Sequence, residues 1–304
     1  MDQANIIMFA TPAARAWRDQ GVSTMDALVT TDWLEKEMGA SDLRIVDATK
    51  LAPDLGRNAR AEYEAGHIPG AVFMDLDDLV DSNNPVENMA PPPEKFASRM
   101  QTLGLGDGSR IVLYDDSPWH TSARAWWLLT LFGAHDVAIL DGGIAKWKAE
   151  GRALDEGAHK LRHRHFTVWK DNKLVRTKEQ MLANLSSKAE EVVDARPAAR
   201  FTGEEADPRP GIAAGHIPGS HNVPAGTMFT PEGLYKSEAD IKATFEAAGV
   251  DLAKPMVTTC GSGITACVLA FGASLTGKRD WAVYDGSWAE WGADADTPKA
   301  TGAA

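Results

Sequence analysis

Hydrophobic and polar positions fall into short apolar runs that alternate with longer amphipathic stretches. The apolar runs are rich in Val and Ile, which is typical of buried strands; they read LRIVDA, RIVLYD, VAILDG, EEVVDA, PMVTTC and WAVYDG. Stretches of helical length lie between them, such as TSARAWWLLTLFG and GITACVLAFGASLTG. This alternation predicts an α/β fold in which mainly parallel sheets carry helices on both faces.

The same series of landmarks occurs twice along the chain. The string AGHIPG stands at 65–70 and again at 214–219. RIVDA and EVVDA precede the two copies, SRIVLYDDS and KPMVTTCGS follow them, and AILDGGIAKW and AVYDGSWAEW come last. Because the period is about one domain, and too long for a solenoid unit, the repetition predicts two copies of one fold.

We therefore expect two tandem domains, residues 27–151 and 177–304, with a linker over 152–176. The linker contains the basic, histidine-rich string HKLRHRH, which we interpret as a solvated strand and not as a metal or anion site. Residues 1–26 are expected to form an N-terminal extension. They carry Asp2 and no basic lead before a short apolar patch, so they do not resemble a signal peptide.

Composition and charge narrow the classes of function. Hydrophobic residues make up 44% of the 304 residues and charged residues 24%, as in a folded protein with a substantial core. The net charge of −12 argues against nucleic acid as a partner, and no apolar run is long enough to span a membrane. Two cysteines without a CxxC pattern predict neither a disulfide framework nor a metal site. We expect a cytoplasmic protein without metal or organic cofactor.

The string VTTCGSGITAC places a thiol where a parallel sheet binds ligands. Cys260 follows a predicted strand and precedes a predicted helix, so it lies at the carboxyl edge of the sheet. Gly261 and Gly263 let the backbone curl so that successive N–H groups point inward, and the helix N-terminus adds a positive dipole end. Ser262 and Thr265 add hydroxyl donors. The pattern indicates a nucleophilic thiolate in a cradle that stabilises anions.

Other readings of this loop are weaker. Cys267 lies inside the helical pattern, and we interpret it as a buried structural thiol. A phosphatase loop needs an arginine six positions after the cysteine, but that position is Ala266. In the first copy Asp115 stands where the second has Cys260, within DDSPWHTSA, which lacks the glycines. Since aspartate is not a thiol nucleophile, we expect the first copy to be catalytically inactive.

Together these residues resemble the two-domain rhodanese family of sulfurtransferases, over most of the chain from about residue 27 to 297. The loop CGSGIT is similar to the CGSGVT loop of the mercaptopyruvate branch, whereas the thiosulfate branch typically has a basic loop similar to CRKGVT. VYDGSWAEWG and AGHIPG are similar to the family's C-terminal and N-terminal signatures. The resemblance implies two rhodanese-like domains, the second of them catalytic.

The resemblance also implies a covalent reaction in two halves. The Cys260 thiolate attacks the sulfur of 3-mercaptopyruvate, pyruvate leaves, and the enzyme carries a persulfide. A small thiol, a thioredoxin-like protein or cyanide then accepts the outer sulfur. Thiosulfate sulfurtransfer is the near alternative, although residues 261 and 262 are not basic here. A non-enzymatic scaffold that senses sulfur or binds a partner is the distant alternative. We expect a monomer, because two fused domains already complete the cleft.

Substrate-binding residues are carried over position by position. The resemblance implies that Arg200 and Arg209 bind the carboxylate and ketone of the substrate, for which planar guanidinium forks are suited. We assign Arg196 to structure, as a partner of nearby acids. The loop residues implied to contact the substrate or take part in the chemistry are Gly261, Ser262, Gly263, Ile264 and Thr265.

One position departs from the family pattern. Some members hold an aspartate and a histidine near the loop serine, proposed to act as a proton relay. Asp77 matches the aspartate and is a candidate for the layer behind the substrate contacts, but the histidine position is Asn88, which cannot shuttle a proton. The proton then moves through water, or the substrate arrives as its thiolate. We interpret His67 and His216, in the repeated AGHIPG, as hydrogen-bonded structural residues.

Overall fold

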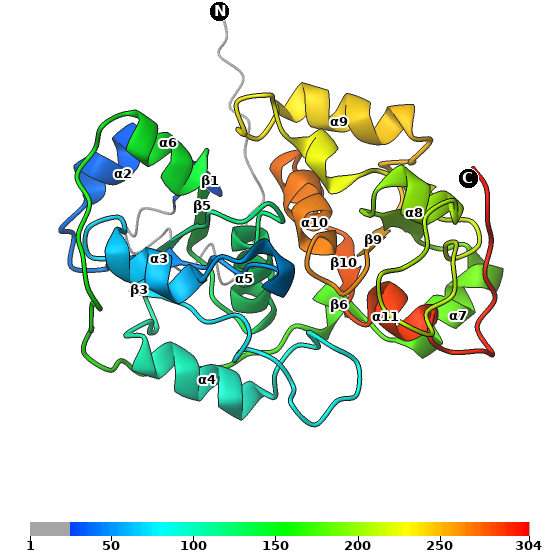
Figure 1. Cartoon of the computed structure of the whole chain (residues 1–304), viewed down its shortest axis with the longest axis horizontal. Coiled ribbons are helices and arrows are strands. Elements are labelled where there is room, and N and C mark those ends of the chain that lie inside the picture. Colours follow the sequence, from blue (N-terminus) through cyan, green and yellow to red (C-terminus); the bar gives the residue numbers. More distant parts are fainter. Residues whose placement is uncertain (1–24, 304) are drawn as a thin grey trace, which may run out of the picture.

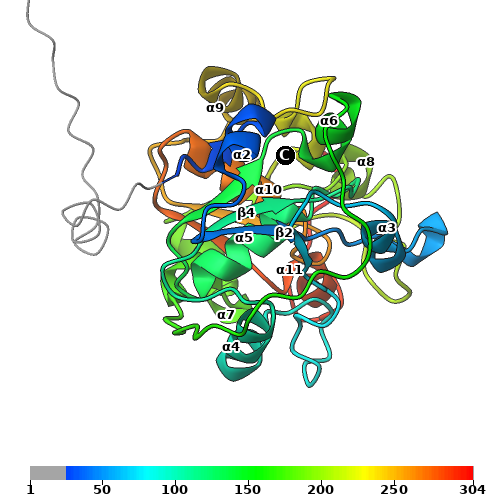
Figure 2. The ribbon, with the colours of Figure 1, turned by 90° about the vertical axis from the view of Figure 1, so that its left-hand side faces the viewer.

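The computed structural model describes residues 25–303, so all but the last two residues of the expected extension, 1–26, lie outside it. The described chain forms two five-stranded sheets in which every paired strand is parallel. The strand orders are β1-β5-β4-β2-β3 and β6-β10-β9-β7-β8, so the second repeats the first. Two units lie side by side, each with helices on both faces of its sheet (Figure 1, Figure 2). The predicted fold class is confirmed.

Side-chain caps mark the start of several helices in the first unit. Thr30 accepts a hydrogen bond from the Trp33 N–H, and Asn58 accepts one from the Ala61 N–H, which satisfies amides that a helix leaves unpaired. The elements of this unit are β1 (Leu28–Val29), α2 (Thr31–Glu37), β2 (Leu43–Asp47), η1 (Pro53–Leu55), α3 (Ala59–Ala65), β3 (Val72–Phe73), α4 (Pro93–Thr102), β4 (Arg110–Tyr114), α5 (Ser122–Leu131), β5 (Val137–Leu140) and α6 (Gly143–Ala149).

The second unit is built in the same way. Thr177 and Gln180 form a capping box at its first helix. Its elements are η2 (Asn172–Leu174), β6 (Val175–Arg176), α7 (Lys178–Ser187), β7 (Glu191–Asp194), α8 (Ala198–Thr202), β8 (His221–Asn222), η3 (Ala225–Met228), α9 (Glu238–Ala247), β9 (Met256–Thr259), α10 (Ala266–Leu275), β10 (Trp281–Tyr284) and α11 (Ser287–Trp291).

Neighbouring strand residues face opposite layers of helices. Val46 in β2 and Val193 in β7 point into one core that both units share, and Phe271 of α10 belongs to it as well. Ile45 packs into a second core on the outer face of the first sheet, and Val192 packs into a third on the outer face of the second sheet. Because both faces are covered, the strands carry apolar residues at successive positions.

Helices α5 and α10 pack against each other between the two sheets (Figure 1). Trp126 of α5 meets Phe271 of α10 edge-on, with ring centroids 4.9 Å apart, and lies 5.1 Å from the Trp281 ring of β10. Two carboxylates reach across the interface in opposite directions: Asp285 accepts the Ala90 N–H, and Asp141 accepts the Tyr235 N–H. The two repeats are therefore joined by equivalent residues.

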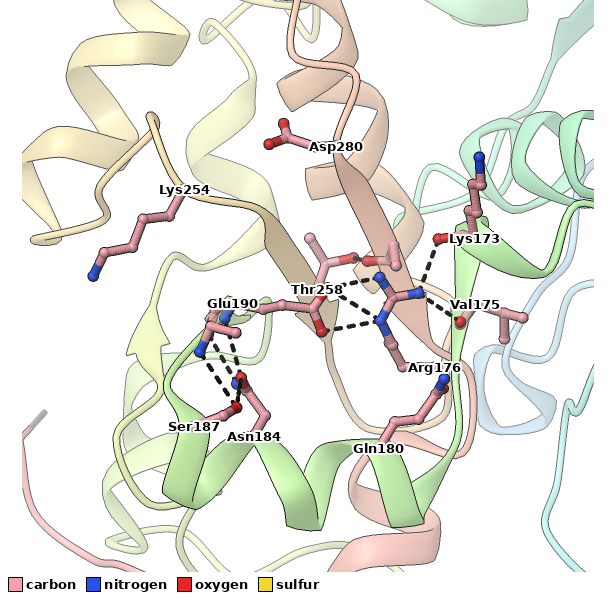
Figure 3. Close-up of polar contacts among 12 residues, drawn as sticks. Lys173, Val175, Arg176, Gln180, Asn184, Ser187, Glu190, Lys254, Thr258 and Asp280 are labelled. Carbon is pink, nitrogen blue, oxygen red and sulfur yellow. Dashed lines mark hydrogen bonds and ion pairs between the residues drawn. The ribbon is translucent and has the colours of Figure 1, made fainter.

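The segment expected as a linker ends in a strand. Val175 and Arg176, its last two residues, pair with β10 as the edge strand β6. Figure 3 shows Arg176 donating to both carboxylate oxygens of Glu190. Both residues line a surface hollow of about 780 Å³. Glu190 and Pro255 line this hollow and directly precede β7 and β9, so it lies at the amino edge of the sheet. It is therefore remote from the cysteine loop, which follows β9.

Candidate active site

The cysteine loop joins the carboxyl end of β9 to α10. Cys260 is only 2% exposed, and its carbonyl accepts a hydrogen bond of 2.9 Å from the Trp288 N–H. The next carbonyl, of Gly261, accepts the Ala289 N–H at 2.8 Å. The Cys260 N–H donates to Ser287 Oγ at 3.1 Å. The first turn of α11 therefore fixes the backbone of Cys260 and Gly261 through three hydrogen bonds.

The backbone amides that follow Cys260 are free for a ligand. Within residues 25–303, no N–H from Gly261 to Ala266 donates a hydrogen bond to a protein group. Gly263 has a φ of +77°, and a Cβ there would lie 2.6 Å from the Asp285 carbonyl oxygen, so this turn needs glycine. Free amides at the N-terminus of a ten-residue helix form a site for negative charge.

The matching loop of the first unit is filled by its own side chain. Asp115 Oδ1 accepts the Ser117 N–H at 2.9 Å, and Oδ2 accepts the Ser122 N–H at 2.8 Å. A carboxylate therefore occupies loop amides in the first unit, where the second unit has Cys260 and unpaired amides.

Arg209 lies directly against the cysteine loop. Its Nη1 donates to the Gly261 carbonyl at 3.0 Å and to Glu87 Oε1 at 2.6 Å. Its Nε and Nη2 both donate to the carboxylate of Asp207, each at 2.7 Å. The structure thus brings Arg209 to Cys260's neighbour, and Glu87, from the first unit, reaches the same guanidinium.

The other residues that the resemblance implies make fewer hydrogen bonds to the protein than Arg209 does. Arg200, in α8, donates from Nε to Glu205 at 2.9 Å and is 36% exposed along its side chain. Ile264 is 6% exposed. Ser262 and Thr265 are half-buried, and neither hydroxyl has a hydrogen-bond partner among the described residues. Both hydroxyls are therefore available to a ligand.

A segment of the first unit covers the loop. Arg124 of α5, 2% exposed, donates to the Gly263 carbonyl at 3.1 Å and to Asp285 Oδ1 at 2.6 Å, and it also donates to the Asn88 carbonyl. Asp285 in turn accepts the Ala90 N–H at 2.7 Å. The segment that holds Asn88 and Ala90 is thereby fixed to the same network as the loop.

The side chains of Asp77 and Asn88 are bridged by Lys50, which contacts both of them. Lys50 Nζ lies 2.5 Å from Asp77 Oδ1 and 2.9 Å from Asn88 Oδ1. The Lys50 side chain is 11% exposed, whereas that of Asp77 is 74% exposed. The position that a relay histidine would occupy therefore carries an amide bound to an ammonium group. Sequence reasoning did not find Lys50.

Residues assigned to structure behave as follows. Burial raises the pKa of the Cys267 thiol to about 12, so this cysteine stays neutral. Arg196 pairs with Asp194, as expected. His216 Nδ1 lies 2.8 Å from the Phe201 carbonyl. His67 differs from the expectation that it is fully hydrogen-bonded. Its Nδ1 contacts the Tyr63 carbonyl and its ring stacks on the Tyr63 ring, but its buried Nε2 has no partner among residues 25–303.

Several residues that contact the cysteine loop or its network were not predicted from the sequence. Glu87 and Arg124 lie far from Cys260 along the chain, and no spacing rule connects them. Asp285 and Ser287 stand in the repeated signature, which was the one available signal. In residues 25–303 no group of three or more His, Cys, Asp or Glu side chains is arranged around a metal position, and no helix there is long and apolar enough to cross a bilayer.

Comparison with known proteins defines the class to which this fold and loop belong. The family model for the rhodanese-like domain matches residues 30–150 and 177–294. The chain is 42% identical over 271 residues to 3-mercaptopyruvate sulfurtransferase of Mus musculus, covering 87% of this chain and 91% of the relative. It is 40% identical over 271 residues to thiosulfate sulfurtransferase of Gallus gallus, covering 87% and 93%.

A solved structure agrees with these matches. The crystal structure of SseA from Escherichia coli, described as a 3-mercaptopyruvate sulfotransferase with the rhodanese fold, superposes with a TM-score of 0.80 at 36% identity. The superposition covers 87% of this chain and 99% of that one. The fold and the cysteine loop thus define a two-unit protein of parallel sheets with one cysteine site. This chain belongs to the rhodanese family.

Proposed function

We propose that this protein is a sulfurtransferase that moves the sulfur of 3-mercaptopyruvate to an acceptor through a persulfide on Cys260. The observation that carries the proposal is a thiol at the carboxyl end of β9, followed by six backbone amides without protein acceptors in the described chain. The names of the mouse and E. coli relatives support the choice of donor.

The first half-reaction forms one bond and breaks one. The Cys260 thiolate attacks the sulfur of the donor, forming an S–S bond. The C–S bond breaks, and its electron pair stays on carbon as the enolate of pyruvate, which then takes a proton from water. The thiol proton of the donor remains on the outer sulfur or leaves to solvent. The loop amides stabilise the anionic sulfur before and after transfer.

The second half-reaction restores the enzyme. An acceptor thiolate or cyanide attacks the outer sulfur, and the electron pair of the S–S bond returns to Cys260. We propose a small thiol, a thioredoxin-like protein or cyanide as acceptor. We also propose that the enzyme acts as a monomer in a reducing compartment such as the cytoplasm, because both units contribute to one site and both cysteines are free thiols.

Arg209 and Arg200 are proposed to bind the carboxylate and the neighbouring ketone of the donor. Arg209 is oriented by a bidentate contact with Asp207, whose side chain is 3% exposed, so its position is fixed before the substrate arrives. The first unit, residues 27–151, is proposed to do no sulfur chemistry itself, because Asp115 occupies its loop.

Thiosulfate is the competing donor, because the chicken relative of 40% identity is a thiosulfate sulfurtransferase. A dianion favours basic side chains in the loop, but here Gly261 and Ser262 follow the cysteine. The two guanidinium groups at the loop come from elsewhere in the chain: Arg209 donates to the Gly261 carbonyl, and Arg124 donates to the Gly263 carbonyl. The loop therefore offers amides and hydroxyls, which favours a monocarboxylate donor over a dianion.

Steady-state turnover tests the proposal directly. The donors are 3-mercaptopyruvate and thiosulfate, the acceptors are cyanide and a dithiol, and the variants are wild type and Cys260→Ser. We expect a strong preference for mercaptopyruvate, no turnover in Cys260→Ser, and the mass of one added sulfur on the peptide that holds Cys260. A preference for thiosulfate would assign the protein to the other branch. No turnover with either donor would favour a non-catalytic scaffold.

A further inference from the structure

The guanidinium proposed to receive the substrate already holds a carboxylate from the other unit. Arg209 Nη1 donates to Glu87 Oε1 at 2.6 Å while it also donates to the Gly261 carbonyl at 3.0 Å. The same Arg209 nitrogen therefore binds both the Glu87 carboxylate and the backbone of the cysteine loop. It stands where an oxygen of an anionic donor would bind if that donor is to bring its sulfur to Cys260.

The two acids on Arg209 differ in their freedom to move. Asp207 is 3% exposed and holds two guanidinium nitrogens, so it cannot leave without stranding a buried charge. The Glu87 side chain is 51% exposed, and its one hydrogen bond with a described residue is the one that Oε1 accepts from Arg209. Its carboxylate can rotate into water at little cost, because a half-exposed ion pair contributes little free energy.

We propose that Glu87 is a specificity-determining residue, whose carboxylate occupies Arg209 in the resting enzyme and must be displaced by the donor's carboxylate. This inference rests on the proposed function, because it assigns Arg209 to the donor. Every anionic donor must break the ion pair between Glu87 and Arg209, which lowers its affinity for the enzyme. Only a carboxylate that forms further contacts with the loop offsets this loss of binding free energy. Neutral molecules gain nothing from Arg209 and are not subject to the competition.

Alkylation of Cys260 tests the competition without sulfur transfer. Iodoacetate carries a carboxylate, whereas iodoacetamide is neutral and of nearly the same shape. We expect Glu87→Gln to raise the ratio of the iodoacetate rate to the iodoacetamide rate about two- to fivefold at low salt, as befits a half-exposed ion pair. The increase should shrink in high salt, because screening weakens the ion pair that is removed.

Glu94→Gln is the matched control. It removes an exposed acid of the same type from α4, and Glu94 makes no contact with Arg209. Its ratio should equal that of wild type. An equal rise in both variants would mean that net charge alone is responsible, and no rise in Glu87→Gln would overturn the competition. A fall in Glu87→Gln would show that Glu87 orients Arg209 instead of blocking it, which also overturns the proposal.

Turnover separates this inference from the proposed function. We expect Glu87→Gln to lower KM for 3-mercaptopyruvate about two- to fivefold while kcat stays within twofold of wild type. An unchanged or raised KM in an active enzyme would overturn the role of Glu87 alone. If wild type transfers no sulfur from mercaptopyruvate, the proposed function fails, and the alkylation ratio still decides whether Glu87 competes with anions for Arg209.

Discussion

Ser287 is a residue with a side chain in a backbone conformation that favours glycine. Its φ is +49°, and its hydroxyl accepts the Cys260 N–H at 3.1 Å while donating to the Tyr284 carbonyl at 2.8 Å. The equivalent residue of the first unit is Gly143, with a φ of +55°. The second unit thus has a strained serine where the first unit has a glycine, so the strain accompanies a contact with the backbone of Cys260.

Replacing Ser287 tests that contact. Ser287→Ala keeps the strain and leaves the buried Cys260 amide unpaired, so we expect a loss of about 1–3 kcal/mol in the free energy of unfolding. Ser287→Gly loses the same bond but relieves about 1 kcal/mol or more of strain. Both should slow persulfide formation, whereas urea unfolding should find the glycine variant the more stable. Wild-type rates in both variants would show that Ser287 does not position Cys260.

Gly263 offers a second test at single-residue scale. In Gly263→Ala the new Cβ would lie 2.6 Å from the Asp285 carbonyl oxygen at a φ of +77°. We expect about 1–2 kcal/mol of backbone strain plus about 1–3 kcal/mol of overpacking, with loss of turnover. Gly277→Ala is the control, since its φ is +81° and no atom of the part of the chain that the structure describes lies within 4 Å of the new Cβ. Equal losses of stability in the two variants would contradict the close approach.

What the sequence reveals at this scale depends on distance along the chain. Cys260 and its glycines are predicted from a single short string, because a strand, a turn and a helix follow one another there. Glu87 and Lys50 cannot be predicted in that way. Glu87 contacts Arg209 because the first unit packs on the second. Lys50 contacts Asn88 within the first unit, at a separation of 38 residues. No local sequence pattern encodes either contact.

At the scale of elements, the two copies use different partners for one buried aspartate. Asp194 ends β7 and is bound by Arg196, whereas Asp47 ends β2 and is bound by the backbone N–H and hydroxyl of Thr49. Both carboxylates are buried. In the first copy no cation among residues 25–303 pairs with this aspartate. Burial raises the pKa of Asp47 to about 6, and nearby Asp115 adds to the rise, while hydrogen bonds with Thr49 lower it.

This difference predicts a pH-dependent stability. Because the folded pKa of Asp47 lies above its unfolded value near 4, stability falls as pH rises from about 4 to about 6 and stays lower above that range. Asp47→Asn keeps an acceptor for Thr49 and removes the charge. We expect it to add about 1–3 kcal/mol at pH 7.5 and nearly nothing at pH 4. Urea unfolding at both pH values is the measurement, and an equal effect at both would contradict this account.

The strands and helices that are buried could be predicted from the sequence, because burial requires runs of apolar residues. All six apolar runs form strands, and both long apolar stretches contain the interface helices α5 and α10. The four strands at the sheet edges, β1, β3, β6 and β8, have two residues each and were not predicted. A two-residue strand has no hydrophobic period, so only its pairing with a neighbour defines it. For this reason the expected linker contains β6.

At the scale of the whole molecule, the first unit contacts the cysteine loop of the second unit through Arg124. This buried guanidinium stacks 4.5 Å over the Trp127 ring and donates to Asp285 Oδ1 and to the Gly263 carbonyl. Burial alone lowers the pKa of Arg124, but the Asp285 carboxylate and other neighbours more than reverse this, so the arginine stays charged. The ion pair therefore joins the two units and the cysteine loop at one point.

Two variants separate the structural part of this contact from its effect on the loop. Arg124→Met leaves the buried Asp285 carboxylate without its cation, and we expect a loss of about 3–5 kcal/mol. The double variant Arg124→Met/Asp285→Asn should recover about 1–3 kcal/mol, because a neutral amide oxygen still accepts the Ala90 N–H. Urea unfolding measures both losses, and single-turnover persulfide formation is measured alongside.

In both variants the Gly263 carbonyl has lost the donor that comes from the other unit. If Arg124 sets the loop's geometry, persulfide formation should stay slow in the double variant even though stability returns. If stability and rate return together, Arg124 acts only as one half of an ion pair between the units. The first result would give the first unit a defined task, because the cysteine loop would then be held in shape from across the interface.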